Sequence, residues 1–167
     1  MSGEIMLTVT KISLKYKNQI EEMWEEWEKV ESCLEPVLNP ERLSFSDYLK
    51  MIKNLESQSQ FPMQFYLLLD KNQLIGYLEL RFSQNDFNKE YAGHLGYAIR
   101  PSKRRLGYGL QALKKGIQEL KKKKVKPIIL TCDQDHQVSM KMFDQVNAKF
   151  VKMSHMEDEI KCIYQLD

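Results

Sequence analysis

The 167-residue sequence has few of the features that mark exported, membrane-spanning or metal-binding proteins. Its three cysteines, Cys33, Cys132 and Cys162, are isolated and odd in number, so they predict neither a disulfide framework nor a metal site. No run of about 18 apolar residues exists, so no membrane span is expected. The first residues contain no long apolar segment followed by a small-residue cleavage site, and we expect a cytoplasmic protein with no membrane partner.

The sequence also lacks a strong excess of either charge. Lys and Arg number 25 and Asp and Glu number 23, which gives a net charge of +2 and argues against nucleic acid as a partner. The basic run Lys121–Lys124 ends a predicted helix, where cations complement the helix dipole. With 43% hydrophobic residues, a chain of this length is expected to fold as a single domain over residues 1–167.

What the sequence does contain is a series of segments in which apolar residues recur with the period of either a strand or a helix. Segments with the period of a strand cover 6–13, 65–69, 74–82, 94–99, 127–132, 149–153 and 160–166. Segments with the period of a helix cover 20–30, 45–55, 110–120 and 138–146. Ser44 or Ser46 can cap the second helix, and Asp70–Gln73 can form a hairpin turn. This order predicts an α/β (α+β) fold, a single sheet with helices on both faces.

Residues 94–113 (HLGYAIRPSKRRLGYGLQAL) place a strand, a basic loop and a glycine turn directly before an amphipathic helix. The first amide groups of a helix have no intrahelical acceptor, and the helix dipole adds about half a positive charge there. Gly107 and Gly109 lack a Cβ, so the backbone can approach a ligand closely. Arg104 and Arg105 are forked donors suited to phosphate oxygens. The segment therefore predicts a phosphate site at the start of this helix.

The motif Arg104-x-x-Gly107-x-Gly109 resembles the acetyl-CoA pyrophosphate motif of the GCN5-related N-acetyltransferase (GNAT) family. IILTCDQDH followed by VSMKMF resembles the next strand and helix of that family, and the resemblance covers about the last hundred residues. It implies a mixed, mostly antiparallel sheet whose two central parallel strands splay apart to admit the pantetheine arm. It also implies acetyl-CoA as co-substrate, no metal, and direct transfer of acetyl to a small-molecule or peptide amine in a ternary complex.

The resemblance also implies which residues hold the CoA. Main-chain amides of the motif would face the pyrophosphate, the main chain of the preceding strand would bind pantetheine, and a histidine stands where the family carries asparagine. The residues expected to bind CoA are Ala98, Ile99, Arg104, Arg105, Leu106, Gly107, Tyr108, Gly109, Leu110 and His136.

Catalysis requires a neutral amine and a leaving thiolate. A lysine-like amine has a pKa near 10.4, so deprotonation at pH 7 costs about 4.6 kcal/mol and calls for a base. Two candidates are His94, which opens the motif strand, and Glu79, on the face of its strand opposite Leu78. Each also has a non-catalytic interpretation: His94 as a structural residue at a strand end, and Glu79 as a solvated side chain. Phe143 occupies the position where the family commonly has a tyrosine that protonates the thiolate. Either another group donates this proton or the thiolate leaves unassisted.

Three further interpretations compete with acetyl transfer. Gly107-x-Gly109-x-x-Ala112 also fits a dinucleotide fingerprint, but a long basic loop precedes it and Lys126 stands where an acidic ribose ligand belongs. An acyl-CoA-binding sensor with little turnover is the stronger alternative, because Phe143 cannot donate a proton. A nucleic-acid-binding role is the weakest of the three. The identity of the amine and the choice between a monomer and a homodimer stay open.

Overall fold

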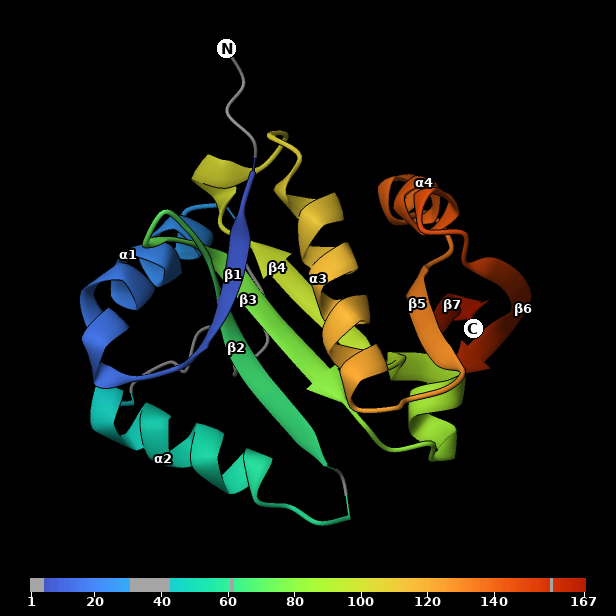
Figure 1. Ribbon diagram of the computed structural model, residues 1–167, viewed down its shortest axis with the longest axis horizontal. Helices are drawn as coiled ribbons and strands as arrows, with labels where there is room; N and C mark the ends of the chain where they lie inside the picture. Colours follow the sequence, from blue (N-terminus) through green and yellow to red (C-terminus); the bar gives the residue numbers. More distant parts are fainter. Residues whose placement is uncertain (1–4, 31–42, 61, 157) are drawn as a thin grey trace.

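The computed structural model describes residues 5–30, 43–60, 62–156 and 158–167, so Cys33 lies outside the described residues. The strands form two antiparallel sheets (Figure 1). The four-stranded sheet has the order β1 (Leu7–Lys11), β2 (Met63–Asp70), β3 (Gln73–Arg81) and β4 (Leu95–Ile99). The three-stranded sheet has the order β5 (Ile128–Asp133), β7 (Glu159–Leu166) and β6 (Lys149–Met156).

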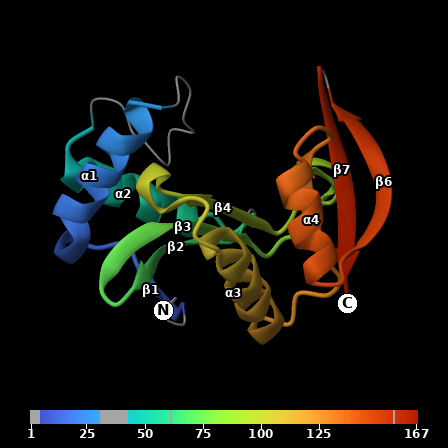
Figure 2. The ribbon, with the colours of Figure 1, turned by 90° about the horizontal axis from the view of Figure 1, so that it is seen from above.

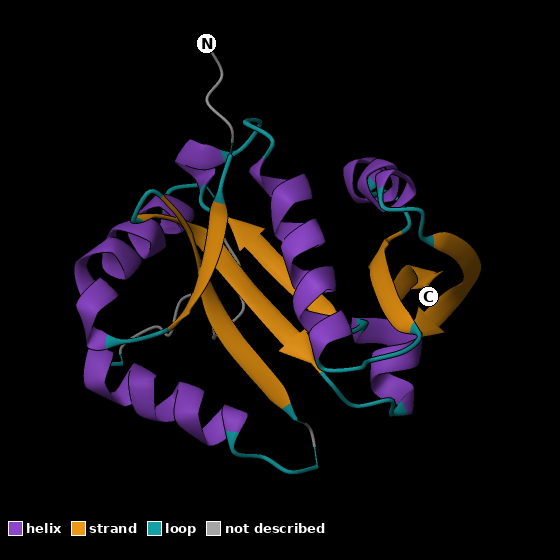
Figure 3. Ribbon diagram, in the orientation of Figure 1, coloured by secondary structure: helices purple, strands orange, loops and turns teal. Residues whose placement is uncertain are grey.

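Helices cover both faces of the four-stranded sheet (Figures 2 and 3). On one face lie α1 (Lys17–Glu28) and α2 (Phe45–Glu56), and on the other lies α3 (Tyr108–Lys122). The fourth helix, α4 (Gln137–Gln145), packs beside β5. Short helical turns cover Leu14–Tyr16, Pro101–Lys103 and, as a π-helical turn, Asn88–Ala92. No helix in the described ranges has the length and apolar character that a bilayer crossing needs.

Local sequence signals fix several of these elements as expected. The Ser44 side chain accepts a hydrogen bond from the Asp47 amide at 3.1 Å and so caps α2. Lys71 and Asn72 have φ values of 48° and 67°, the positive values that a two-residue hairpin turn requires between β2 and β3. One boundary differs from the prediction: α1 ends at Glu28, and Val30 is 57% exposed rather than part of the apolar stripe.

The two sheets meet where β4 and β5 begin. The His94 amide donates to the Ile129 carbonyl at 2.8 Å. Among the described residues no other main-chain hydrogen bond joins the two strands, which then diverge while running in the same general direction (Figure 1). The expected fold, with helices on both faces and splayed central strands, is confirmed, and the splay is wide enough that the expected single sheet is divided into two hydrogen-bonded sheets. One buried cluster spans both sheets, α3 and α4, so the gap between the strands lies over a continuous core.

Candidate active site

A cleft of about 750 Å³ lies where β4 and β5 diverge. Its walls come from these two strands, the loop before α3, the first turns of α3, and α4. Successive side chains of β4 point to opposite faces, so Tyr97 packs against the cluster under α3 whereas Ala98 packs against the cluster under α1 and α2. Both residues line the cleft, which is therefore bordered by both faces of the strand.

The start of α3 offers unpaired main-chain donors at one end of this cleft. In the described part of the chain, no acceptor is found for the amides of 106–110, and the first bond of the helix runs from Gln111 to Gly107 at 3.4 Å. Gly107 caps the helix with φ 88°, a left-handed conformation that glycine adopts without strain. Tyr108, the first helical residue, donates its hydroxyl to Asp70 at 2.7 Å and so ties this turn to the end of β2.

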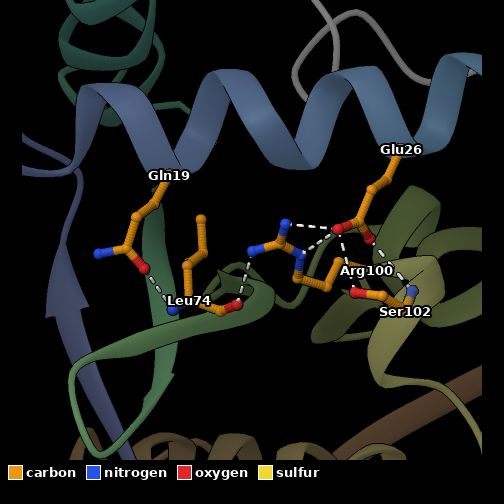
Figure 4. Close-up of polar contacts among 5 residues, drawn as sticks. All are labelled: Gln19, Glu26, Leu74, Arg100 and Ser102. Carbon is orange, nitrogen blue, oxygen red and sulfur yellow. Dashed lines mark hydrogen bonds and ion pairs between the residues drawn. The ribbon is translucent and has the colours of Figure 1, made fainter.

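The loop before α3 is held to α1 by an ion pair between a buried arginine and a partly exposed glutamate (Figure 4). Arg100 follows β4 directly, is 7% exposed, and donates two hydrogen bonds to Glu26 and one, at 3.2 Å, to the Leu74 carbonyl. The amide and hydroxyl of Ser102 donate to the same carboxylate at 3.1 and 3.0 Å. Burial raises the pKa of Glu26, but the hydrogen bonds from Arg100 and Ser102 outweigh it and lower the pKa to about 2. A second contact, from the Leu74 amide to Gln19 at 2.7 Å, fixes the other end of α1.

His94 is fully buried at the seam between the sheets. Its Nδ1 accepts a hydrogen bond from the Ile129 amide at 2.8 Å, and its Nε2 lies 3.2 Å from the Ser83 carbonyl, which requires the Nε2–H tautomer. Burial lowers the pKa of His94 and outweighs the opposing hydrogen bonds to Ser83 and Ile129. Because both ring nitrogens are occupied and the residue is absent from the cleft walls, this geometry favours the structural interpretation of His94 over the base.

We expect His94→Ala to lower the free energy of unfolding by about 2–4 kcal/mol, because it leaves a cavity and an unpaired buried amide at Ile129. Since the folded state holds the imidazole neutral, the wild type should also lose stability as the pH falls below about 6.5, where the unfolded chain binds the proton. Denaturant titrations at two pH values measure both effects. His155→Ala, at an exposed position, is the matched control. An unchanged midpoint for His94→Ala would contradict the seam assignment.

Glu79 lies beside the cleft rather than in its wall. Its carboxylate pairs with Arg81 at 2.7 Å, and the side chain is 17% exposed. In the register of β3 and β4 it faces Gly96, which does line the cleft. A Cβ on Gly96 would lie 3.3 Å from the Arg81 guanidinium, so glycine here lets the ion pair lie close over β4.

A network of charged side chains borders the cleft from the second sheet. Lys161 bonds to Asp133 at 2.5 Å and to Glu159 at 2.9 Å, and its ammonium lies 4.8 Å from the centre of the Tyr91 ring. Tyr91 in turn donates its hydroxyl to Glu159. Burial lowers the pKa of Lys161, but its hydrogen bonds to Asp133 and Glu159 outweigh burial and raise the pKa above the ordinary value. Lys161 and Asp133 both line the cleft.

On the side of α4, the cleft wall is mostly apolar. His136 Nδ1 and the Ser139 hydroxyl lie 2.7 Å apart at the start of the helix. Phe143 is 4% exposed and its ring meets that of Tyr164 edge-on at 5.1 Å. The Tyr97 hydroxyl reaches α4 from β4 and donates to the Met142 sulfur at 3.8 Å.

Most residues predicted to bind CoA are brought together by the fold, although their binding stays a prediction. Those that line the cleft are Ala98, Ile99, Arg104, Arg105, Gly107, Gly109, Leu110 and His136. Leu106 and Tyr108 do not line it, because the Leu106 side chain is 58% exposed and the Tyr108 side chain points to Asp70. These two residues contribute only their main-chain amides, which belong to the free donors at the start of α3. No group of three or more potential metal-ligating side chains occurs among the described residues.

Sequence reasoning missed a second set of cleft residues. They come from β4, β5, α4 and β7, and they are Gly96, Tyr97, Thr131, Cys132, Asp133, Ser139, Met142 and Lys161. One signal could have found two of them: because side chains alternate along a strand, the sequence alone could have placed Gly96 on the same face as Ala98, and Tyr97 on the opposite face. Nothing local could have found Lys161, because only the pairing of β5 with β7 brings it opposite Asp133.

Comparison with known protein families identifies the family to which this fold belongs. The model of the acetyltransferase (GNAT) family matches residues 20–147, which is more than half of the chain. The chain belongs to the GNAT acetyltransferase family. A search of curated proteins found no match.

Several solved GNAT structures share the fold at low sequence identity. The microcin C7 self-immunity acetyltransferase MccE, solved with acetyl-CoA and AMP, is 17% identical with a TM-score of 0.68 over 99% of this chain and 93% of that one. RimL, a ribosomal L7/L12 α-N-protein acetyltransferase solved with coenzyme A, is 14% identical with a TM-score of 0.70 over 98% and 94%. The Salmonella typhimurium enzyme that modifies the N-terminal serine of L7/L12 is 12% identical with a TM-score of 0.66 over 99% and 96%.

Proposed function

We propose that this protein is an acetyl-CoA-dependent N-acetyltransferase that moves an acetyl group to a primary amine by direct attack in a ternary complex. The observation that carries the proposal is a cleft bordered by both faces of β4, with free amides of the α3 start at one end. A donor held at that end and an amine arriving from the opposite face could then meet between the strands. Family membership supports acetyl transfer in general, and the amine acceptor is our extension of it.

The residues of the cleft fit an acyl-CoA. Amides 106–110 and the guanidinium groups of Arg104 and Arg105 supply the donors that a diphosphate needs. β4 is an edge strand of its sheet, and its main chain near Ala98 and Ile99 can hydrogen-bond to an extended amide-containing arm as a partner strand would. At this edge the Ile99 carbonyl already accepts a hydrogen bond from Arg104 Nε at 3.0 Å. A main-chain amide at the same edge can stabilise the oxyanion of the reacting carbonyl.

Of the two predicted bases, Glu79 is the better placed. It lies on the face of β3 that meets Gly96, the side from which the amine would arrive, whereas both ring nitrogens of His94 are occupied in the seam. Because the Glu79 carboxylate is paired with Arg81, we infer that it acts through a water molecule.

We expect Glu79→Gln to lower turnover by about a hundredfold or more and to leave the affinity for acetyl-CoA unchanged, since a positioned general base typically contributes about 10²–10⁴-fold. The pH–rate profile of the variant should lose its acid limb. Glu90→Gln, which removes a carboxylate paired with Lys152 away from the cleft, is the control. An unaltered profile in Glu79→Gln would remove Glu79 from the mechanism.

Calorimetry with acetyl-CoA, followed by thiol release over a panel of amines, tests the proposal. We expect micromolar binding and release of CoA with at least one class among small amines, polyamines, amino acids and peptide N-termini. Absence of binding would refute the function. Binding without release for any amine would favour the alternative, an acyl-CoA sensor, which the buried Phe143 in the α4 wall supports.

A further inference from the structure

One hydroxyl in the cleft is held only by a weak partner. Tyr97 lines the cleft from the middle of β4, and its O–H donates to the thioether sulfur of Met142 at 3.8 Å. Sulfur is a weak acceptor, so a better acceptor that enters the cleft can take over this donor. A Cβ on Gly109 would lie 3.9 Å from the Tyr97 ring and 3.5 Å from the Met142 sulfur, which places the phenol between the first turn of α3 and α4. A chain running from the start of α3 into the gap between the strands would pass it.

Three of the other side-chain donors around the cleft already have partners within the described residues. Lys161 is bound by Asp133 and Glu159 at 2.5 and 2.9 Å. Ser139 and His136 are paired with each other at 2.7 Å. Phe143, the neighbour of Met142 on α4, has no donor at all.

We propose that the Tyr97 hydroxyl donates a hydrogen bond to the sulfur of CoA and stabilises the thiolate as it leaves, a role that rests on the proposed function. The bond between the amine nitrogen and the carbonyl carbon forms, the carbon–sulfur bond breaks, and its electron pair goes to sulfur. The proton lost by the amine leaves through the base.

Tyr97 keeps its own proton throughout this step. Burial raises the pKa of Tyr97 to about 12, well above the value of about 8.5 for an ordinary thiol. The phenol therefore acts as a hydrogen-bond donor to the thiolate, which takes its proton from solvent as CoA departs. A competing thiol inside the cleft, Cys132, stays protonated, because burial raises its pKa to about 11.

The test compares CoA with desulfo-CoA and needs no knowledge of the amine. If the site stabilises the thiolate, CoA should gain affinity over desulfo-CoA as the pH rises from about 7 to about 9.5, through the pKa of the bound thiol. In Tyr97→Phe we expect this gain to shrink about tenfold or more, because a hydrogen bond to a charged group is lost. The affinity for desulfo-CoA should not change.

Two matched variants make the outcome decisive. Tyr164→Phe removes a phenol on the far side of Phe143, outside the cleft walls, and should behave as wild type. Ser139→Ala tests the competing hydroxyl. The same gain in Tyr97→Phe and wild type, no gain in wild type, or a loss confined to Ser139→Ala would each overturn the assignment. Failure of the wild type to bind either nucleotide would instead refute the proposed function.

Discussion

Replacement of Gly107 by glutamate is expected to weaken acetyl-CoA binding by about a hundredfold or more. The glutamate would place a negative charge beside the free amides of 106–110, where the diphosphate is expected, and two like charges about 4 Å apart near a surface repel by about 4 kcal/mol. Space for a side chain exists, since a Cβ at Gly107 would touch only the end of Ile5 at 3.4 Å. Calorimetry with acetyl-CoA measures the effect.

Gly107→Gln is the matched control, because it has the same shape and suffers the same strain. Gly107 has φ 88°, so either side chain costs about 1–3 kcal/mol of backbone strain. The difference in acetyl-CoA affinity between the two variants therefore isolates the charge. Thermal unfolding of both variants establishes that they fold. Equal affinity in a folded Gly107→Glu protein would show that the nucleotide binds elsewhere.

Loss of the Glu26 carboxylate is expected to produce the largest change in stability among surface-accessible positions of α1. Glu26→Gln leaves the Arg100 guanidinium, 7% exposed, without its counter-charge and weakens the anchor of the loop at Ser102. Breaking a fully buried pair costs about 3–5 kcal/mol, and because the Glu26 side chain is 25% exposed we expect about 2–3 kcal/mol. For a chain of this size that corresponds to a fall in Tm of about 5–10 °C.

The same pair should give the wild type a characteristic acid dependence. The pKa of Glu26 is about 2 in the folded protein and ordinary in the unfolded chain, so the unfolded chain binds the proton first as the pH falls. The stabilisation is complete above about pH 4.5 and disappears as the pH approaches about 2. Between about pH 7 and about pH 3, denaturant titrations should show a smaller loss of stability in Glu26→Gln than in wild type or in Glu25→Gln, an exposed neighbour; the loss that remains comes from other carboxylates with lowered pKa values, such as Asp47, Glu90 and Glu159. A Glu26→Gln protein with wild-type stability at both pH values would rule out the anchor.

Predictions from the sequence succeeded where the decisive interactions are local. The Ser44 cap, the Lys71–Asn72 turn and the glycine cap at Gly107 each depend on residues within a few positions of one another. The amide donors at the start of α3 follow from helix geometry alone. For the same reason, the motif around Gly107 is sufficient to predict one end of the cleft.

The surroundings of site residues could not be predicted from the sequence where they depend on contacts between distant segments. An isolated histidine has a pKa that suits a general base at neutral pH. In the fold, however, Ser83 and Ile129, which lie on separate segments, engage both ring nitrogens of His94 in hydrogen bonds. The carboxylate of Glu26 reaches Arg100 across 74 positions of sequence. No periodicity or motif carries that information.

The sequence by itself was enough to predict the order of strands and helices, the family and the free amides at the start of α3, because propensity, capping and helix geometry act over a few residues. Only the tertiary structure decided which side chains face the gap between β4 and β5, because that gap exists only once β4 and β5, which belong to separate sheets, lie side by side. Burial and partner choice, which set the protonation of His94, Glu26 and Tyr97, are properties of that packing.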